Sequence, residues 1–206
     1  MYTGIVQARL PIDSVEKKTG LMSFSLTLPP ELTPELELGA SIAVNGCCFT
    51  VTDIDGGSVS FDAIAETLAL SNIKYLAAGT EVNVERSAKG DAEVGGHILS
   101  GHIIGTARIT KVEKSENNVR MTFAGDPDWM KYVFNKGFLA VNGCSLTVAD
   151  IDCSDFSINL IPETLKRTNF SLLAEGDEVN IEIESQTQVI VDTVERVMAE
   201  RYANAG

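Results

Sequence analysis

The octapeptide VNGCCFTV at residues 44–51 returns almost unchanged as VNGCSLTV at residues 141–148. The offset is 97 residues, and only two positions differ: Cys48 becomes Ser145, and Phe49 becomes Leu146. A repeated phrase in which one reactive side chain is altered predicts two related structural units that perform different tasks.

The same offset holds along most of the chain. Further matching pairs are residues 3–6 with 100–103, 53–55 with 150–152, 66–68 with 163–165, and 82–85 with 179–182. A period near 97 residues is too long for one unit of a solenoid. The sequence therefore predicts two copies of one domain, at residues 1–97 and 98–185, followed by a different tail at residues 186–206.

Both copies are predicted to be all-β. TEVNVER at 80–86 and DEVNIEIE at 177–184 alternate between apolar and polar residues, which is typical of half-buried strands. SIAVNGCCFTVTDID at 41–55 is interpreted as one strand that ends at Gly56 and Gly57, with 58–65 as its hairpin partner. Short strands separated by Gly, Asp and Pro predict a small barrel or sandwich.

The tail has no counterpart in the first copy. Ile190, Val194, Val197, Met198 and Tyr202 follow the spacing of one helical face. Such an apolar stripe either covers the helix's own barrel or packs against another subunit, and the pattern alone leaves both alternatives open.

Composition limits the classes of function. The net charge of −13 argues against a nucleic-acid-binding protein, which normally presents a basic face. The sequence shows no apolar run near the ~18 residues that cross a bilayer and no secretory signal pattern. Four cysteines without metal-type or redox-type spacing favour reduced thiols and a cytoplasmic location.

The only two histidines, His97 and His102, lie in GGHILSGHI at 95–103. Their spacing places them on opposite faces of a strand, so no metal site is predicted. His97 is interpreted as a structural, hydrogen-bonded residue. His102 replaces Ile5 of the first copy, and an imidazole can carry protons near neutral pH.

Other positions are either shared between the copies or altered between them. Cys48 against Ser145 is read as a functional difference or as simple drift. Gly4 and Gly101 would allow a ligand to approach the backbone closely. Thr50 and Thr147 offer equivalent hydroxyls. The pairs 66–67 and 163–164 would fix a polar ligand or serve only as turn residues.

Taken together, MYTGIVQ, VNGCCFTVT, GGHILSGHI, VNGCSLTV, LIPETLKRTN and VNIEIE resemble riboflavin synthases of the alpha-subunit type, a family of lumazine-binding barrels. The resemblance implies two similar six-stranded Greek-key closed barrels in tandem plus a C-terminal α-helix. It implies a homotrimer in which the tail helices pack together, and it leaves open an association with lumazine synthase. The implied substrate is 6,7-dimethyl-8-ribityllumazine, and no metal or redox cofactor is expected.

The implied reaction is a dismutation, in which one lumazine transfers four carbons to another held by the neighbouring subunit's barrel. By resemblance, the catalytic residues are Cys48, His102, Ser41, Ser145 and Glu184. Cys48, His102 and Ser41 are assigned to the N-barrel site, and Ser145, Thr147 and Lys136 to the C-barrel site. The full substrate-binding set is Gly4, Ile5, Val6, Cys48, Phe49, Thr50, Asp62, Ala63, Ile64, Ala65, Glu66, Thr67, Gly101, His102, Ile103, Lys136, Ser145, Leu146, Thr147, Leu160, Ile161, Pro162, Glu163, Thr164 and Leu165.

Two positions depart from the family pattern. Tyr2 stands where Phe is usual, and Glu184 stands where Asp is usual, which puts the expected role of Glu184 in doubt. The alternative is a non-catalytic lumazine- or flavin-binding protein of the same fold, like the lumazine proteins of luminous bacteria. Such relatives tend to lose the counterparts of Cys48 and His102, which this chain keeps.

Overall fold

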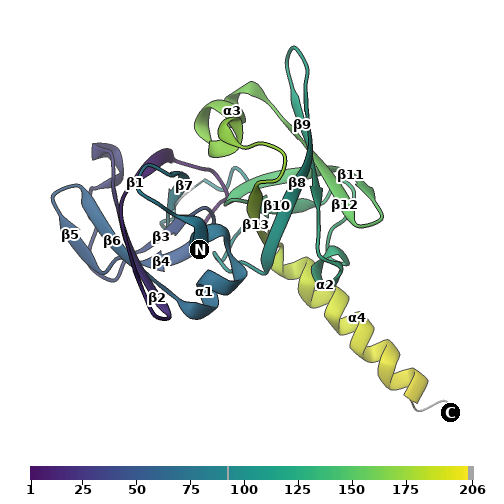
Figure 1. Ribbon diagram of the computed structural model, residues 1–206. Helices are drawn as coiled ribbons and strands as arrows, with labels where there is room; N and C mark the ends of the chain where they lie inside the picture. Colours follow the sequence, from purple (N-terminus) through teal and green to yellow (C-terminus); the bar gives the residue numbers. More distant parts are fainter. Residues whose placement is uncertain (92, 204–206) are drawn as a thin grey trace.

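The structure is a computed structural model that describes residues 1–91 and 93–203. Two β units lie side by side, and a long helix leads away from the second (Figure 1). The strands of the first unit are β1 (Ala8–Lys18), β2 (Leu21–Thr27), β3 (Ser41–Val44), β4 (Cys47–Thr50), β5 (Asp53–Asp55), β6 (Ser58–Ile64) and β7 (Glu81–Arg86). Those of the second are β8 (Gly105–Lys114), β9 (Val119–Ala124), β10 (Phe138–Val141), β11 (Cys144–Asp152), β12 (Asp155–Leu160) and β13 (Glu178–Ile183).

Short helices connect the strands. They are the α-helices α1 (Ala65–Leu70), α2 (Pro127–Met130) and α3 (Pro162–Arg167), and the 3₁₀-helices η1 (Pro30–Leu32), η2 (Asn72–Tyr75) and η3 (Asn169–Leu172). The terminal helix is α4 (Ser185–Ala203). α1 and α3 begin directly after equivalent strands, so the Glu-Thr pairs of the two copies lie in the first turns of equivalent helices.

The second unit is a closed barrel with the antiparallel order β10-β11-β12-β9-β8-β13. The first unit has the same order, except that its counterpart of β11 is divided into β4 and β5. At this break, Val51 donates a backbone hydrogen bond to Ala40 and Thr52 donates one to Ser60, so the chain contacts both neighbouring strands. The predicted fold class of two Greek-key barrels and a C-terminal helix is confirmed.

The interpretation of residues 41–55 as one continuous strand is wrong. Asn45 and Gly46 both have positive φ, 46° and 80°, and form a two-residue turn between β3 and β4. Asn142 and Gly143 repeat it, with φ of 44° and 77°. Asn-Gly is the commonest sequence for this tight turn because both residues tolerate the left-handed region.

The two halves exchange their opening segments. Tyr2 and Leu99, which are equivalent positions of the repeat, pair with each other through backbone hydrogen bonds of 2.8 and 2.9 Å. Val6 then packs in the hydrophobic core of the second barrel, and Ile103 packs against the core of the first. The division of the chain at residues 97 and 98 remains a prediction, since each half contributes to the other.

Buried asparagines join the barrels along the pseudo-twofold axis. Asn72 donates through its side chain to Asn142 Oδ1 at 3.1 Å, and its backbone N–H donates to Asn180 Oδ1 at 2.6 Å. The equivalent bonds run from Asn169 to Asn45 at 3.1 Å and to Asn83 at 2.7 Å. Because these amides are satisfied by one another, the interface can bury polar side chains without leaving them unpaired.

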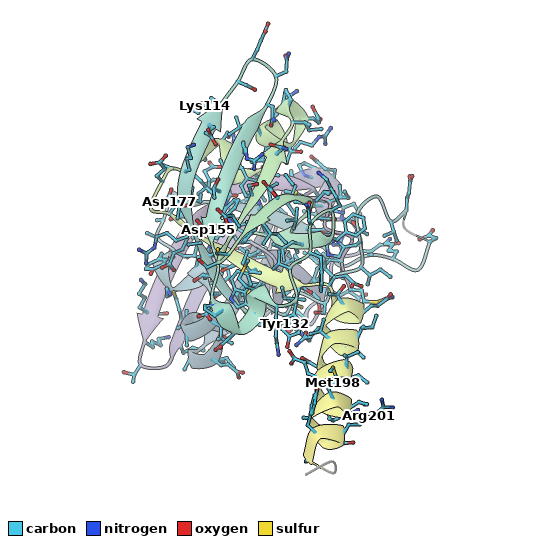
Figure 2. The ribbon with its side chains drawn as sticks, turned by 90° about the vertical axis from the view of Figure 1, so that its right-hand side faces the viewer. Lys114, Tyr132, Asp155, Asp177, Met198 and Arg201 are labelled. Carbon is cyan, nitrogen blue, oxygen red and sulfur yellow. The ribbon has the colours of Figure 1, made fainter. Side chains whose placement is uncertain are left out.

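Helix α4 extends away from both barrels, and only its first half is tied to the fold (Figures 1 and 2). Tyr132 donates a hydrogen bond to Asp192 at 2.6 Å, and Lys131 pairs with Glu195 at 2.7 Å. The apolar side chains of the predicted stripe are 41–74% exposed. No helix in the described part of the chain is long and apolar enough to cross a membrane.

Replacing Asn180 by Ala should lower the free energy of unfolding by roughly 2 kcal/mol, because the backbone N–H of Asn72 and the carbonyl of Asn45 lose buried partners. The matched control is Asn159→Ala, which makes the same change at an exposed position of β12. Urea unfolding of both variants measures the difference. Equal stabilities would contradict a stabilising role for the asparagine interface.

Candidate functional site

Cys48 lies on β4 at the junction of the two barrels. Its backbone N–H donates to the carbonyl of Gly101 at 3.0 Å, and its Sγ accepts a hydrogen bond from the Tyr2 hydroxyl at 3.0 Å. Burial raises the pKa of Tyr2, and the bond to Cys48 raises it further. The hydroxyl therefore stays protonated and can act as a donor to the sulfur.

Gly101 makes this approach possible. A Cβ at that position would lie 2.5 Å from Cys48 Cβ and 3.0 Å from a ring carbon of Tyr2. Gly4 occupies the equivalent place in the other half, where a Cβ would lie 2.5 Å from Ser145 Cβ. The predicted need for close approach at both glycines has a physical basis, although the neighbouring atoms belong to the protein itself.

A cavity of about 160 Å³ opens in the second half. Its lining residues come from the first segment of the chain, from β11, and from α3 with its flanking residues: Gly4, Ile5, Val6, Cys144, Ser145, Leu146, Ile161, Glu163, Thr164, Arg167 and Thr168. The structure thus brings eight of the predicted substrate-binding residues together around one space.

Sequence reasoning missed Cys144, Arg167 and Thr168 in this wall. Arg167 is the most informative of them, because it pairs with Glu163 one helical turn earlier and brings a cation to the cavity. Its counterpart at the 97-residue offset is Leu70. This charge difference between the copies was visible in the alignment of the repeats.

The repeat relation transfers the same wall to the first half. There the counterparts of the lining residues would be Gly101, His102, Ile103, Cys47, Cys48, Phe49, Ile64, Glu66, Thr67, Leu70 and Ser71. The hydrogen bond from Cys48 to Gly101 shows that this segment does lie against β4. By the 97-residue offset, the Cys48 thiol of the first half corresponds to the Ser145 hydroxyl of the second. His102 corresponds to Ile5, and Leu70 corresponds to Arg167.

Two buried glutamates hold the exchanged segments in place. Glu85 accepts hydrogen bonds from the backbone of Thr3 and Gly4 at 2.7 and 3.1 Å. Glu182 accepts equivalent bonds from Ser100 and Gly101 at 2.7 and 3.1 Å. Burial raises the pKa of both carboxyls, and these bonds partly oppose the shift.

Glu184 makes hydrogen bonds at the start of the terminal helix. Its carboxylate accepts bonds from the backbone N–H and the hydroxyl of Thr187, and so caps the N-terminus of α4. Burial raises its pKa, but the bonds from Thr187 and Gln186 outweigh that effect and lower it. The catalytic assignment of Glu184 remains a prediction beside this observed cap.

Other predicted residues lie apart from the cavity wall. Lys136 is exposed, and its ammonium donates to the carbonyl of Ala149 at 3.3 Å. In the second half, Leu160 is fully buried in the core and Thr147 is exposed. The remaining predicted positions outside the described wall are Ser41 on β3, Pro162 and Leu165 on α3, and Thr50, Asp62, Ala63 and Ala65 in the first half.

The cysteines differ in their surroundings. Burial raises the pKa of both Cys47 and Cys144 to about 12, which makes them inert apolar side chains. All four cysteines are free. Within residues 1–91 and 93–203, no group of three or more His, Cys, Asp and Glu side chains could hold a metal ion.

The fold and the paired sites define a class of tandem-barrel ligand-binding proteins. The model of the lumazine binding domain matches residues 3–87 and again residues 100–184. The chain belongs to this lumazine-binding family.

Similar proteins of known name narrow the class. A riboflavin synthase of Escherichia coli strain K12 is 48% identical over 202 residues, covering 98% of this chain and 95% of the relative. A riboflavin synthase of Bacillus subtilis strain 168 is 37% identical over 182 residues, covering 88% and 84%. The resemblance to riboflavin synthases is therefore confirmed.

Solved structures are similar as well. LumP complexed with riboflavin has a TM-score of 0.83 and 27% identity, covering 89% of this chain and all of that one. LumP complexed with 6,7-dimethyl-8-(1'-D-ribityl) lumazine has a TM-score of 0.81 at the same identity, covering 89% and 99%.

Replacing Gly101 by Ala should destabilise the protein more than replacing Gly79 by Ala. Both residues have φ near +80°, so both variants carry the backbone strain of about 1 kcal/mol. At Gly101 the new methyl group also meets Cys48 and Tyr2, whereas at Gly79 no atom of residues 1–91 or 93–203 lies within 4 Å. Chemical denaturation measures the difference, and an equal loss would remove the argument for close packing at Cys48.

Proposed function

We propose that this chain is a riboflavin synthase, a transferase. Two molecules of 6,7-dimethyl-8-ribityllumazine react, one gives four carbons to the other, and the products are riboflavin and 5-amino-6-ribitylaminopyrimidine-2,4-dione. The observation that carries the proposal is similarity to riboflavin synthases along nearly the whole chain, together with a repeated site that differs in its reactive side chains.

The altered residues suit a dismutation. Two copies of one substrate must be held, which explains the shared backbone contacts at Gly4 and Gly101. The two copies must behave differently, which explains the change from Cys48 to Ser145. The acidic C7 methyl group of lumazine has to lose and regain protons. His102, which follows the glycine whose carbonyl binds the Cys48 backbone, is suited to that task.

The assignments of single residues belong to this proposal. Cys48, His102 and Ser41 act at the first site, and Ser145, Thr147 and Lys136 at the second. Holding two rings in reactive geometry can lower the barrier of a bimolecular reaction by up to ~7–11 kcal/mol. Much of the catalysis then comes from alignment of the two bound rings.

The proposed assembly is a homotrimer in the cytoplasm. Its support is the apolar stripe of α4, whose side chains are exposed on a helix that extends away from the chain's own barrels (Figure 1). Reduced cysteines support the location. The reactive site would form where the first barrel of one subunit meets the second barrel of a neighbour. Association with lumazine synthase, which makes the substrate, belongs to the same proposal.

A non-catalytic lumazine- or flavin-binding protein is the second candidate, because LumP shares the fold with TM-scores of 0.81 and 0.83. Its 27% identity is well below the 48% of the riboflavin synthase from Escherichia coli. Incubation with 6,7-dimethyl-8-ribityllumazine and no added cofactor separates the two. Riboflavin formed at half the molar amount of lumazine consumed supports the enzyme, whereas binding without product supports the alternative.

Replacing Cys48 by Ala or His102 by Gln should lower kcat by about 100-fold or more, since a positioned proton carrier contributes on the order of 10²–10⁴. Lumazine binding, followed by fluorescence, should weaken far less. The matched control is Cys153→Ala, which removes an exposed thiol on the turn after β11. Unchanged turnover in the first two variants would refute their assigned roles.

Replacing Val194 by Asp should dissociate the trimer, because the new charge would be buried between the apolar stripes of the packed helices. Ala199→Asp adds the same charge on another face of α4 and serves as the control. Sedimentation equilibrium gives the mass of each variant. A wild-type chain that sediments as a monomer would contradict the proposed assembly.

A further inference from the structure

His97 contacts the altered position of the second half. Its Nδ1 lies 2.7 Å from the Ser145 hydroxyl oxygen, and its ring stacks on Phe138 with centroids 5.2 Å apart. The side chain is buried, with only 8% of the residue exposed. Gly96 allows this approach, since a Cβ there would lie 2.6 Å from Ser145 Cβ.

The second ring nitrogen, Nε2, lacks a hydrogen-bond partner among the described residues. Nε2 is buried, and no hydrogen-bonding group of residues 1–91 or 93–203 reaches it. Burial lowers the pKa of His97, and the nearby charge of Glu184 only partly opposes the shift. The imidazole is therefore neutral near pH 7 and carries one proton, on either Nδ1 or Nε2.

The two neutral tautomers of His97 differ in free energy. A proton on Nε2 would leave a buried N–H without an acceptor, and orphaned donors are rare in folded proteins. A proton on Nδ1 would leave only a bare nitrogen acceptor, which is tolerated more readily. In that tautomer Nδ1–H donates to Ser145 Oγ, so the hydroxyl proton of Ser145 stays free.

We propose that His97 is a positioning residue of the second site: it donates from Nδ1 to Ser145 Oγ and thereby directs the Ser145 hydroxyl proton to a ligand acceptor in the cavity. Ser145 lines that cavity, while His97 stands behind it. The ligand acceptor is a carbonyl oxygen or ring nitrogen of a pteridine-type molecule. That identification of the ligand rests on the proposed riboflavin synthase function.

The first half has a comparable donor from a different source. There the Tyr2 hydroxyl donates to Cys48, the counterpart of Ser145. The repeat counterpart of Tyr2 is Leu99, which has no hydrogen-bonding side chain. His97, from the segment that joins the barrels, supplies the donor that Leu99 lacks. In each half, therefore, a ring side chain is hydrogen-bonded to the residue that differs between the copies, Cys48 or Ser145.

Nitrogen-15 NMR of the free protein tests the tautomer without any turnover. The chain has two histidines, so histidine labelling gives two ring systems, and His102→Gln assigns them. The expected result is a neutral His97 protonated on Nδ1, which shifts toward the Nε2–H form in Ser145→Ala. A His97 protonated on Nε2 in the unmutated protein would overturn the proposal even if riboflavin is formed.

Kinetics test the consequence. His97→Asn can place an amide N–H near the position of Nδ1, whereas His97→Gln moves the amide toward Nε2. The expected kcat falls less than threefold in the first variant and about tenfold in the second, the effect of one misdirected hydrogen bond. In the Ser145→Ala background the two His97 variants should have equal kcat.

Thermal unfolding of both variants serves as the control for folding, since a purely structural histidine would change the unfolding midpoint without separating the two kcat values. Equal kcat in His97→Asn and His97→Gln with Ser145 present would contradict the positioning role. Absence of riboflavin formation in the unmutated protein would instead refute the proposed function and leave the NMR result intact.

Discussion

The structure depends on a buried polar contact between two Asn-Gly turns. A Cβ on Gly46 would lie 2.6 Å from the backbone of Gly143, and the reverse distance is 2.7 Å, so the turns meet backbone to backbone. Around them, asparagine amides from both halves satisfy one another. An apolar interface would tolerate sliding, but these directional bonds permit one relative placement of the barrels. The pseudo-twofold axis, and with it the pairing of Tyr2 with Leu99, follows from that placement.

The exchange of opening segments allows the two symmetric sites to differ in their chemistry. Because residues 3–6 and 100–103 each lie against the opposite barrel, every site combines residues from both copies. A substitution in one opening segment therefore changes only one site. His102 stands at the Ile5 position in the segment whose Gly101 carbonyl binds the Cys48 backbone, while Ile5 itself lines the Ser145 cavity. A few such changes between two copies of one domain are enough to give two sites with a common backbone frame and different chemistry.

Much of this could be predicted from the sequence, because the repeat compares the chain with itself. The constant offset predicted two copies of one all-β domain, and the helical spacing predicted α4. The closed Greek-key barrels and the set of site residues came from the resemblance to riboflavin synthases. The Asn-Gly turn was missed because strand-forming apolar residues flank it directly on both sides, at 42–44 and 47–49, so the apolar segment continues across the change of direction. Contacts between distant segments, such as Tyr2 with Cys48 or Gly4 with Ser145, have no signal in local pattern. Glu184 illustrates a different limit of prediction from sequence. A carboxylate is compatible with catalysis, but in the structure it caps a helix.

The positions that differ between the two halves are more informative when they are considered together than one by one. Cys48 against Ser145 could be drift, but Tyr2 against Leu99 changes at the position that contacts it. Drift at one position gives no reason for a donor to be gained or lost beside it. In the second half, Leu99 lacks the hydroxyl that Tyr2 supplies in the first. There His97, from the segment that joins the barrels, contacts Ser145 instead. Cys48 and Ser145 thus each have a ring side chain as a hydrogen-bond partner, Tyr2 and His97 respectively. The presence of a partner in both halves argues that selection has acted on the orientation of the thiol and the hydroxyl as well as on their identity.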